Sequence, residues 1–373
     1  MIKTTVALSC AAFAAILTAA QGQTMKTEKF PKIESPLPYQ VVQRDPSTVR
    51  KDNTGSAQVA MRWTDPGPVA AYEWQVVALE NAFGKGTTWA SVKPSVSGDV
   101  CRVSITVPVG GWYRLELRRP GAVKLTATVE PVGIGEVFVI AGQSYADNCS
   151  DELLKVQEPQ GRVCVLDPKT GVWRKADDPQ PTPSTYRTGS IWPPFGDDLA
   201  KTLMVPVGLV NVAVAATSSG QWMPGQALHQ NLVQAAKAVG RFRAVLWQQG
   251  ESDVIGGVPA AKYVENLKTI RAALVKECGF ELAWLPAKST IHPTVYNNPK
   301  QEAVIRSAVD TLWKTPGFFP GPDTDTLTGE NRGGAGSQRH FSPIGQRRAA
   351  ALWVGAVTNL IAKPPLSQPK ENP

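Results

Sequence analysis

The chain has 373 residues, 42% of them hydrophobic, and a formal net charge of +8 at pH 7. Its length favours two domains over one. The basic residues are scattered, and the longest runs are pairs such as Arg118-Arg119, whereas nucleic-acid-binding proteins carry a clustered basic stripe. We therefore expect a solvated basic surface with at most a mild attraction to acidic glycans, and no nucleic-acid partner.

Residues 1–22 have the pattern of an export signal. Lys3 precedes an apolar stretch over residues 6–17, and residues 20–22 (Ala-Gln-Gly) form a small-x-small cleavage site. The apolar stretch is too short to cross a bilayer, and no later segment is suited to do so. We expect an exported protein, periplasmic or extracellular, without a membrane span. Residues 23–54 are polar and rich in proline, which predicts a leading arm.

Residues 55–133 are predicted to form a small antiparallel β-sandwich. The expected strands cover residues 58–63, 73–78, 103–107, 112–117 and 123–129. Several of them alternate apolar with polar residues, and turns that contain glycine or proline separate them.

After residue 133 the pattern changes to that of a parallel α/β domain. Continuous apolar runs, typical of buried parallel strands, cover residues 137–140, 207–215, 244–247 and 282–285. Helical spacing of apolar residues occurs between and after them, over residues 227–239, 260–275 and about 343–361. Strands that alternate with helices predict a three-layer α/β/α domain over residues 134–362. The tail over residues 363–373 is expected to be disordered.

Four cysteines remain once the export signal is removed. Cys149 and Cys164 are the better candidates for a disulfide, and Cys101 and Cys278 are the other two; buried reduced thiols are an equally good alternative. Neither a CxxC pair nor a Cys/His metal spacing occurs. We therefore expect no metal and no other cofactor.

Ser144 is the first candidate for a reactive group. It follows the apolar run 137–140 in the segment Gly142-Gln143-Ser144, and reactive groups in open α/β sheets lie past the carboxyl ends of strands. The segment is not a G-x-S-x-G elbow, because Ala146 occupies the last position. A serine at a strand end is also a common helix cap, so Ser144 alone does not identify a nucleophile.

Two further strand ends bring polar groups to the same edge of the sheet. Residues 208–225 pass from a strand into small residues, whose backbone N–H groups can face a ligand. Residues 245–253 deliver Gln249, Glu251 and Asp253 past another strand. The side-chain amide of Gln249 is a suitable oxyanion donor, and either carboxylate can orient a histidine. The structural alternatives are an ordinary loop, a helix-capping Glu251 and an exposed Asp253.

His340 is the histidine best placed for proton transfer. It lies in the Gly-rich stretch 333–345, just before the last predicted helix. His229 is expected on a helix surface, and His292 precedes a proline in a loop that can line a pocket.

Together these segments resemble the SGNH-type hydrolases, specifically the sialate O-acetylesterase and acetylxylan esterase group of carbohydrate esterases. The matching pieces are the strand that ends in Gly-Gln-Ser144, residues 217–222 (Thr-Ser-Ser-Gly-Gln-Trp), 247–251 (Trp-Gln-Gln-Gly-Glu) and 340–345 (His-Phe-Ser-Pro-Ile-Gly). They occur in the order that the family uses, within residues 134–362. The resemblance implies a flavodoxin-like α/β/α fold and hydrolysis of acetyl esters without a metal. The preceding sandwich resembles accessory domains of some relatives.

The resemblance also implies roles for individual residues. Ser144 matches the nucleophile, with its own N–H as the first oxyanion donor, and Gln249 matches the amide donor. Ala216 stands where relatives commonly have the second oxyanion glycine, which is tolerable if its φ is negative. Tyr145 replaces a common asparagine, which alters the pocket wall. His340 matches the general base.

The orienting acid departs from the commonest pattern of the family. Many SGNH enzymes have an aspartate three residues before the histidine, where this chain has Ser337. Some relatives use the glutamate of the Gln-Gly-Glu motif, which is kept here as Glu251. We therefore favour Glu251 over Asp253, and a Ser144–His340 dyad without an acid is the remaining option.

The sequence thus predicts an exported serine esterase that removes O-acetyl groups from a carbohydrate through an acetyl-enzyme. A lipase or thioesterase on the same scaffold is one alternative, and a non-catalytic glycan-binding protein is another. The departures at Ser337, Ala216 and Tyr145 favour the non-catalytic alternative, whereas the intact Ser144, Glu251 and His340 argue against it. Candidates for substrate contact are Gln143, Tyr145, Trp192, Trp222 and His292, with burial in the core an equally good account of both tryptophans. The sugar, the acetylated position and the oligomeric state are not indicated.

Overall fold

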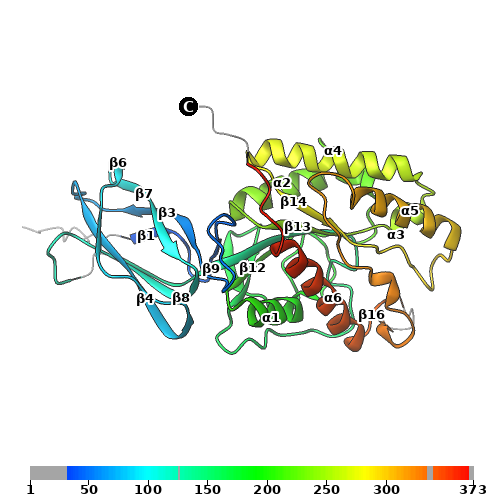
Figure 1. The fold of residues 1–373 in the computed structure, drawn as a ribbon, viewed down its shortest axis with the longest axis horizontal. Helices are drawn as coiled ribbons and strands as arrows, with labels where there is room; N and C mark the ends of the chain where they lie inside the picture. The colour runs from blue at the N-terminus through cyan, green and yellow to red at the C-terminus, as the bar shows by residue number, and fades with distance from the viewer. Residues whose placement is uncertain (1–31, 125–126, 334–338, 369–373) are drawn as a thin grey trace, which may run out of the picture.

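The computed structural model describes residues 32–124, 127–333 and 339–368, so the predicted export signal lies outside the described residues. Figure 1 shows two lobes along the long axis of the molecule, a β-sandwich and a larger α/β domain. The predicted fold class, a three-layer α/β/α domain preceded by an antiparallel sandwich, is confirmed.

The sandwich consists of two facing sheets. One has the order β1 (Lys32–Ser35), β3 (Ser56–Thr64), β7 (Val100–Pro108) and β6 (Ser95–Ser97); in the other, β5 (Ala90–Val92), β4 (Tyr72–Phe83), β8 (Gly110–Arg118) and β9 (Ala127–Gly142) follow one another. Alternation explains the burial: Val59, Met61 and Trp63 of β3 face the core, and the residues between them face solvent. Of the expected strands, only the one over residues 123–129 is displaced, because β9 begins at Ala127.

Strand β9 joins the two lobes. Its first part pairs antiparallel with β8 in the sandwich, and its last part pairs in parallel with strands of the α/β sheet. The predicted domain boundary between residues 133 and 134 therefore lies inside one continuous strand. The predicted leading arm also belongs to the fold, since β1 completes a sandwich sheet and β2 (Val41–Gln43) pairs in parallel with residues 133–135 of β9.

The α/β sheet has a flavodoxin-like centre. Its strands are β10 (Val163–Asp167), β11 (Val172–Lys175), β12 (Val207–Asn211), β13 (Ala244–Gln248) and β14 (Ala283–Pro286), together with the end of β9. Their spatial order is β11-β10-β12-β9-β13-β14, and all pairs but β10–β11 are parallel. β10 and β12 lie on one side of β9, and the later strands β13 and β14 lie on its other side. The direction in which strands are added therefore reverses between β9 and β13. Ligands of such sheets bind at this switch point, outside the carboxyl ends of the strands.

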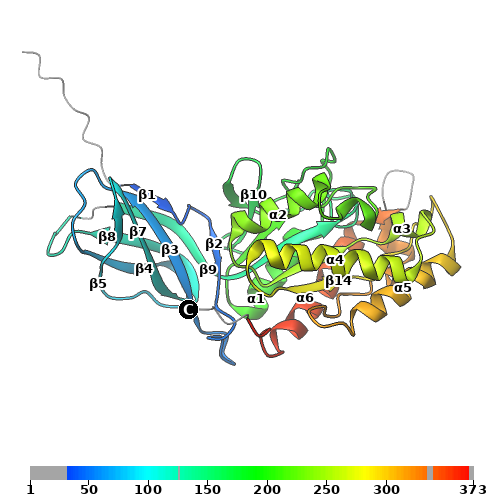
Figure 2. The ribbon, with the colours of Figure 1, turned by 90° about the horizontal axis from the view of Figure 1, so that it is seen from above.

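Helices cover both faces of this sheet (Figures 1 and 2). α1 (Trp192–Leu203) and α6 (Pro343–Ile361) pack on one face, whereas α2 (Ala227–Val239), α4 (Ala260–Cys278) and α5 (Pro299–Leu312) pack on the other, beside the short α3 (Glu251–Ile255). Consecutive residues of β9 serve the two cores in turn: Phe138 and Ile140 face α1 and α6, and Val137 and Val139 face α2 and α4. None of the helices within the described ranges is long and apolar enough to cross a membrane.

Two local predictions are wrong. The described part of the tail, residues 363–368, is held to the domain, because the side-chain amide of Gln368 exchanges two hydrogen bonds with the backbone of Glu281; residues 369–373 lie outside the described residues. His229 is buried rather than on the surface, because its face of α2 packs toward the sheet. Cys101, Cys149, Cys164 and Cys278 are free thiols, which agrees with the reduced alternative.

Candidate active site

Ser144 lies at the switch point of the α/β sheet. Gly142, the last residue of β9, pairs with Gln248, the last residue of β13, so the segments that follow both strands leave the sheet side by side. Gly142 has a φ of 134°, and a Cβ atom there would lie 2.1 Å from the carbonyl oxygen of Gln248. Only glycine fits this approach. The next residue, Gln143, donates its N–H to the same carbonyl at 3.0 Å.

Several backbone N–H groups at this edge are free to bind an oxyanion, among them those of Ser144 and Ala216. In the described part of the chain, the N–H of Ser144 and the N–H of Ala216 have no acceptor. The neighbouring N–H of Ala215 is already used, since it donates to the Asp147 carboxylate at 3.3 Å. The buried Asp147 also accepts a bond from Thr182 Oγ1 at 2.9 Å. Asp147 thus connects the loop after Ser144 to the loop that contains Ala216.

Ala216 has an unexpected backbone conformation. The sequence interpretation made alanine tolerable at this position on the condition that its φ is negative, but the structure has a φ of 60°, in the left-handed region. This region is costly for residues with a Cβ atom and is easily reached by glycine. That condition is not met, and the N–H is presented in the conformation that a glycine would adopt.

Replacing Ala216 with glycine should raise the free energy of unfolding by about 1 kcal/mol, because it removes the left-handed strain. Urea denaturation of the two proteins measures the difference. Ala215→Gly is the matched control, because Ala215 has no positive φ; it should lower stability by roughly 0.5–1 kcal/mol. Equal losses in both variants would contradict the assignment of strain to Ala216.

Gln249 is held by other protein groups. Its Nε2 atom donates to Asp253 Oδ2 at 2.5 Å, and it also lies 3.1 Å from the Thr217 carbonyl oxygen and 3.2 Å from Gln143 Oε1. The hydroxyl of Tyr263 lies 2.8 Å from the carbonyl oxygen of Gln249 and 3.1 Å from its Oε1 atom, so it packs against the residue from the side of α4. In this arrangement the two amide hydrogens of Gln249 are used within the protein.

Asp253 is buried, not exposed as the structural alternative assumed, and its carboxylate has its own partners. Its Oδ1 atom accepts the hydroxyl of Ser219 at 2.6 Å, and its Oδ2 atom accepts the N–H of Ser219 at 2.8 Å in addition to the Gln249 amide. Burial raises the pKa of Asp253, although these bonds oppose the rise. The carboxylate thus links the loop of Ser219 to the end of β13.

Glu251 has one oxygen without a partner. It begins α3 and is completely buried, and Ser289 donates its hydroxyl to Oε1 at 2.5 Å. The other oxygen, Oε2, is buried without a hydrogen bond to any described residue. Burial raises the pKa of Glu251 to about 8, and the Ser289 bond and the Arg332 charge only partly oppose this rise. At neutral pH this carboxyl group is largely protonated.

His340 lies beside the residue that follows Ser144. It forms the short strand β16 (His340–Phe341), which pairs with β15 (Arg332–Gly333), and its ring centroid is 5.3 Å from that of Tyr145. Neither the imidazole nor Ser144 Oγ makes a hydrogen bond within the described ranges. Burial, the charges of Arg339 and Arg332, and His292 lower the pKa of His340 to about 3. The imidazole is therefore neutral at pH 7 and able to accept a proton. Ser337 lies outside the described residues.

Two arginines make this side of the site electropositive. The guanidinium of Arg332 lies 4.8 Å from the Tyr145 ring centroid, and it donates to the carbonyl oxygens of Leu327 and Thr324. Burial and the charges of Arg339 and Arg332 lower the pKa of His292 to about 4. The Nδ1 atom of His292 and the Nε atom of Arg339 are buried without partners among the described residues.

The residues predicted to contact substrate divide into two groups. Trp192 and Trp222 are completely buried, so neither can offer a ring face to a sugar. The first donates its Nε1–H to the Ala146 carbonyl at 2.7 Å, and the second packs 5.2 Å from Trp247. The other three candidates lie around Ser144 but are also nearly buried: Gln143, Tyr145 and His292. Through Oε1, Gln143 accepts the N–H of Ser252 at 3.1 Å and so braces the loop after β13.

The sequence interpretation missed Ser289, Asp147 and Arg332. Ser289 follows β14, so the strand-end rule that identified Ser144 and Glu251 also applies to it. Asp147 and Arg332 had no comparable signal, because their partners lie in other segments. Within the described ranges, no group of three or more His, Cys, Asp or Glu side chains is arranged to hold a metal ion.

Comparison with known proteins identifies related sequences and a related fold. Residues 134–309 match the family described as carbohydrate esterase, sialic acid-specific acetylesterase. A protein of Arabidopsis thaliana named as a probable carbohydrate esterase is 37% identical over 65 residues, 16% of this chain; the match spans only a quarter (25%) of that protein. The crystal structure of a carbohydrate acetylesterase from Xanthomonas citri has a TM-score of 0.53 at 17% identity, and the alignment covers 87% of this chain and 74% of that one. That likeness extends over both lobes of the fold.

Proposed function

We propose that this protein removes O-acetyl groups from a carbohydrate through an acetyl-enzyme formed on Ser144, because residues 134–309 match the family of sialic acid-specific acetylesterases. The observation that carries the proposal is the pair of free N–H groups, those of Ser144 and Ala216, at the switch point of the sheet. Free donors beside a strand-end hydroxyl are what an acyl-transfer site requires.

In the proposed mechanism, His340 accepts the proton of Ser144 while the hydroxyl oxygen attacks the acetyl carbonyl. The neutral imidazole has the protonation state that this step needs. The N–H groups of Ser144 and Ala216 bind the developing oxyanion, and each such donor contributes on the order of 3–4 kcal/mol to the transition state. His340 then gives the proton to the departing sugar hydroxyl, and water hydrolyses the acetyl-enzyme.

Gln249 and Glu251 complete the proposed site. Gln249 is the third oxyanion donor once substrate displaces one of its present acceptors. Glu251 is the acid that orients His340 and stabilises the imidazolium, because its Oε2 atom is buried and unpaired whereas both oxygens of Asp253 are occupied. The charge of Arg332 acts on the pKa of both Glu251 and His340.

The protein is proposed to act outside the cytoplasm, since residues 1–22 have the pattern of an export signal. An acetylated polysaccharide or an O-acetylated sialic acid would then be its substrate. The proposed hydrolysis of either substrate uses no cofactor.

Acetate release tests the proposed activity. The purified protein is given acetylated xylan, O-acetyl sialic acid and a synthetic acetyl ester, and a long-chain acyl ester of the same alcohol serves as the comparison. We expect acetate from at least one carbohydrate and a strong preference for acetyl over the long chain. Preference for the long chain would instead favour the lipase or thioesterase alternative. No hydrolysis of any ester would favour the non-catalytic, glycan-binding alternative.

A further inference from the structure

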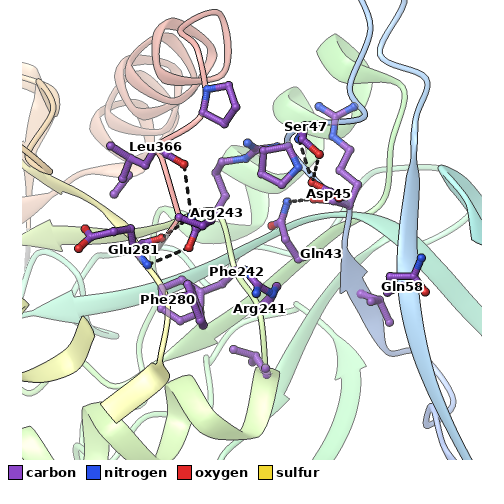
Figure 3. A pocket seen from close by; sticks show the side chains of 18 of the residues that line it. Gln43, Asp45, Ser47, Gln58, Arg241, Phe242, Arg243, Phe280, Glu281 and Leu366 are labelled. Atoms are coloured by element: carbon purple, nitrogen blue, oxygen red, sulfur yellow. Dashed lines mark hydrogen bonds between the residues drawn. The ribbon is translucent and has the colours of Figure 1, made fainter. Parts of the chain in front are cut away.

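A cavity of about 790 Å³ lies between the sandwich and the α/β domain. Its walls include residues 42–47, the segment 58–60 of β3, residues 237–243 before β13, and residues 363–368 of the ordered tail. Figure 3 shows side chains from all four segments around one space, with Gln58 on the sandwich side and Arg243 and Leu366 on the α/β side. The cavity thus exists only because the two lobes and the tail meet.

The cavity is separate from the candidate active site. Arg243 precedes β13 and lines the cavity, whereas Gln249 follows β13 at the switch point. Six residue steps along an extended strand correspond to ~20 Å. The cavity therefore lies at the opposite end of the parallel strands from Ser144.

The lining of the cavity carries an excess of positive charge. Five basic side chains line it, from Arg44, Lys237, Arg241, Arg243 and Lys363, against the two acids Asp45 and Glu281. The acid Glu281 is paired outside the cavity with Arg271, and Lys237 is paired with Glu277.

Two exposed cations of the lining have no acidic partner in the part of the chain that the structure describes: Arg241 and Lys363. The guanidinium of Arg241 lies 5.0 Å from the Phe280 ring centroid, and the Lys363 amine lies 5.3 Å from that of Phe319. Aromatic faces hold both cations at the cavity without neutralising them.

The Nη2 group of Arg44 has no hydrogen-bond acceptor among the described residues. Arg44 is fully buried; its Nε–H donates to Glu136 at 2.7 Å and its Nη1 donates to the carbonyl oxygen of Asn53 at 2.8 Å. Its Nη2 atom is buried without a partner among the described residues. Glu136 is shared, because Arg243 also donates two bonds to it. Two guanidiniums thus share one carboxylate at the wall of the cavity, and a buried unpaired donor calls for an acceptor.

We propose that this cavity is a second binding site, which takes a carboxylate-bearing sugar unit of an acidic oligosaccharide. The carboxylate pairs with Arg241 and Lys363, which have no acidic partner among the described residues, while the apolar wall of Val42, Phe242 and Leu366 packs against the sugar ring. That the ligand is a carbohydrate rests on the proposed function; that it is an anion rests on the cavity alone. The site would hold a polymeric substrate while hydrolysis proceeds at the other end of the sheet.

Isothermal titration calorimetry on the full chain tests this proposal. The protein carries Ser144→Ala, so that binding is measured without hydrolysis. The ligands are tetragalacturonate, the neutral xylotetraose and inorganic phosphate. We expect saturable binding of tetragalacturonate, about tenfold weaker in the Arg241→Glu, Lys363→Glu double variant and weaker at higher salt. Arg102→Glu is the charge-reversal control for each single variant, Arg241→Glu and Lys363→Glu, because Arg102 is exposed on β7 and does not line the cavity; it should bind like the parent. Arg44 is left in place because its removal would leave Glu136 buried with less compensation.

Each outcome decides the proposal. Equal binding of xylotetraose would overturn the carboxylate requirement, and equal competition by phosphate would reduce the site to a general anion site. No binding of tetragalacturonate at millimolar concentration, or equal loss in the Arg102→Glu control, would remove the cavity as the site. The proposed activity is judged separately, since the double variant with Ser144 intact should hydrolyse a small synthetic acetyl ester at the normal rate.

Discussion

Ser144→Ala should lower kcat/KM for acetate release by roughly 10⁴- to 10⁶-fold, because it removes the atom that forms the acetyl-enzyme. Ser144 is 5% exposed and its hydroxyl makes no hydrogen bond to a described residue. Losing the hydroxyl should therefore change the free energy of unfolding by no more than about 0.5 kcal/mol. Steady-state kinetics and thermal unfolding of the same preparation measure the two effects.

A serine of the same motif region provides the control for this variant. Ser252 contributes only its backbone N–H to Gln143 Oε1, so Ser252→Ala should retain most of the activity. Trapping and mass spectrometry of the acyl-enzyme should place an added acetyl group on Ser144 in the parent protein. If Ser144→Ala hydrolyses acetyl esters at the parent rate, Ser144 is not the nucleophile.

At about pH 9, where Glu251 is ionised, Glu251→Gln should lower kcat/KM by about 10³- to 10⁴-fold, since the amide cannot stabilise the imidazolium of His340. The parent protein should gain activity as pH rises through about 8, where Glu251 loses its proton, because only the carboxylate can stabilise that charge. The variant should lack this rise. A pH profile of kcat/KM from pH 6 to about 9.5 compares the two, and the apparent pKa belongs to the coupled pair Glu251 and His340.

Glu251→Gln should also be more stable than the parent protein at alkaline pH. The pKa of Glu251 is about 8 in the folded protein, against 4.5 for a glutamate side chain in solution. Between these values the folded state keeps a proton that the unfolded state has lost, so stability falls as pH rises from about 4.5 to about 8. Glutamine carries no charge to bury, and Glu251→Gln should gain on the order of 1–3 kcal/mol at pH 9 and nothing near pH 4. Urea denaturation at both pH values measures this difference.

Asp253→Asn is the comparison that separates the two candidate acids. Asp253 accepts bonds from Ser219 and Gln249, and asparagine would place an N–H₂ group against one of these donors. We expect a loss of roughly 1–3 kcal/mol in stability but an unchanged alkaline rise in the pH profile. If Asp253→Asn abolishes this rise and Glu251→Gln keeps it, the orienting role passes to Asp253.

The spacing of apolar residues, together with the residues that cap helices and end strands, was sufficient to predict most of the helices and strands. The helices α2 and α6 begin and end where the apolar spacing predicted, because Gly240 follows the first and Ser342-Pro343 starts the second. The strand ends at Ser144 and Gln249 were likewise readable, since a buried parallel strand is a continuous apolar run followed by an abrupt change to small and polar residues. These are local properties, and they depend on residues within a few positions of one another.

Contacts between residues far apart in the sequence determined the features that local patterns could not predict. Arg44 meets Glu136 across 92 positions, and Trp353 donates to Gln248 across 105. The same kind of contact buries Trp192, holds the tail at Glu281, continues β9 through both lobes and opens the cavity between them. Sequence patterns indicate which face of an element is apolar, but they do not indicate which partner this face meets. The unpaired oxygen of Glu251 and the lowered pKa of His340 both result from burial, and burial occurs only when distant segments pack together.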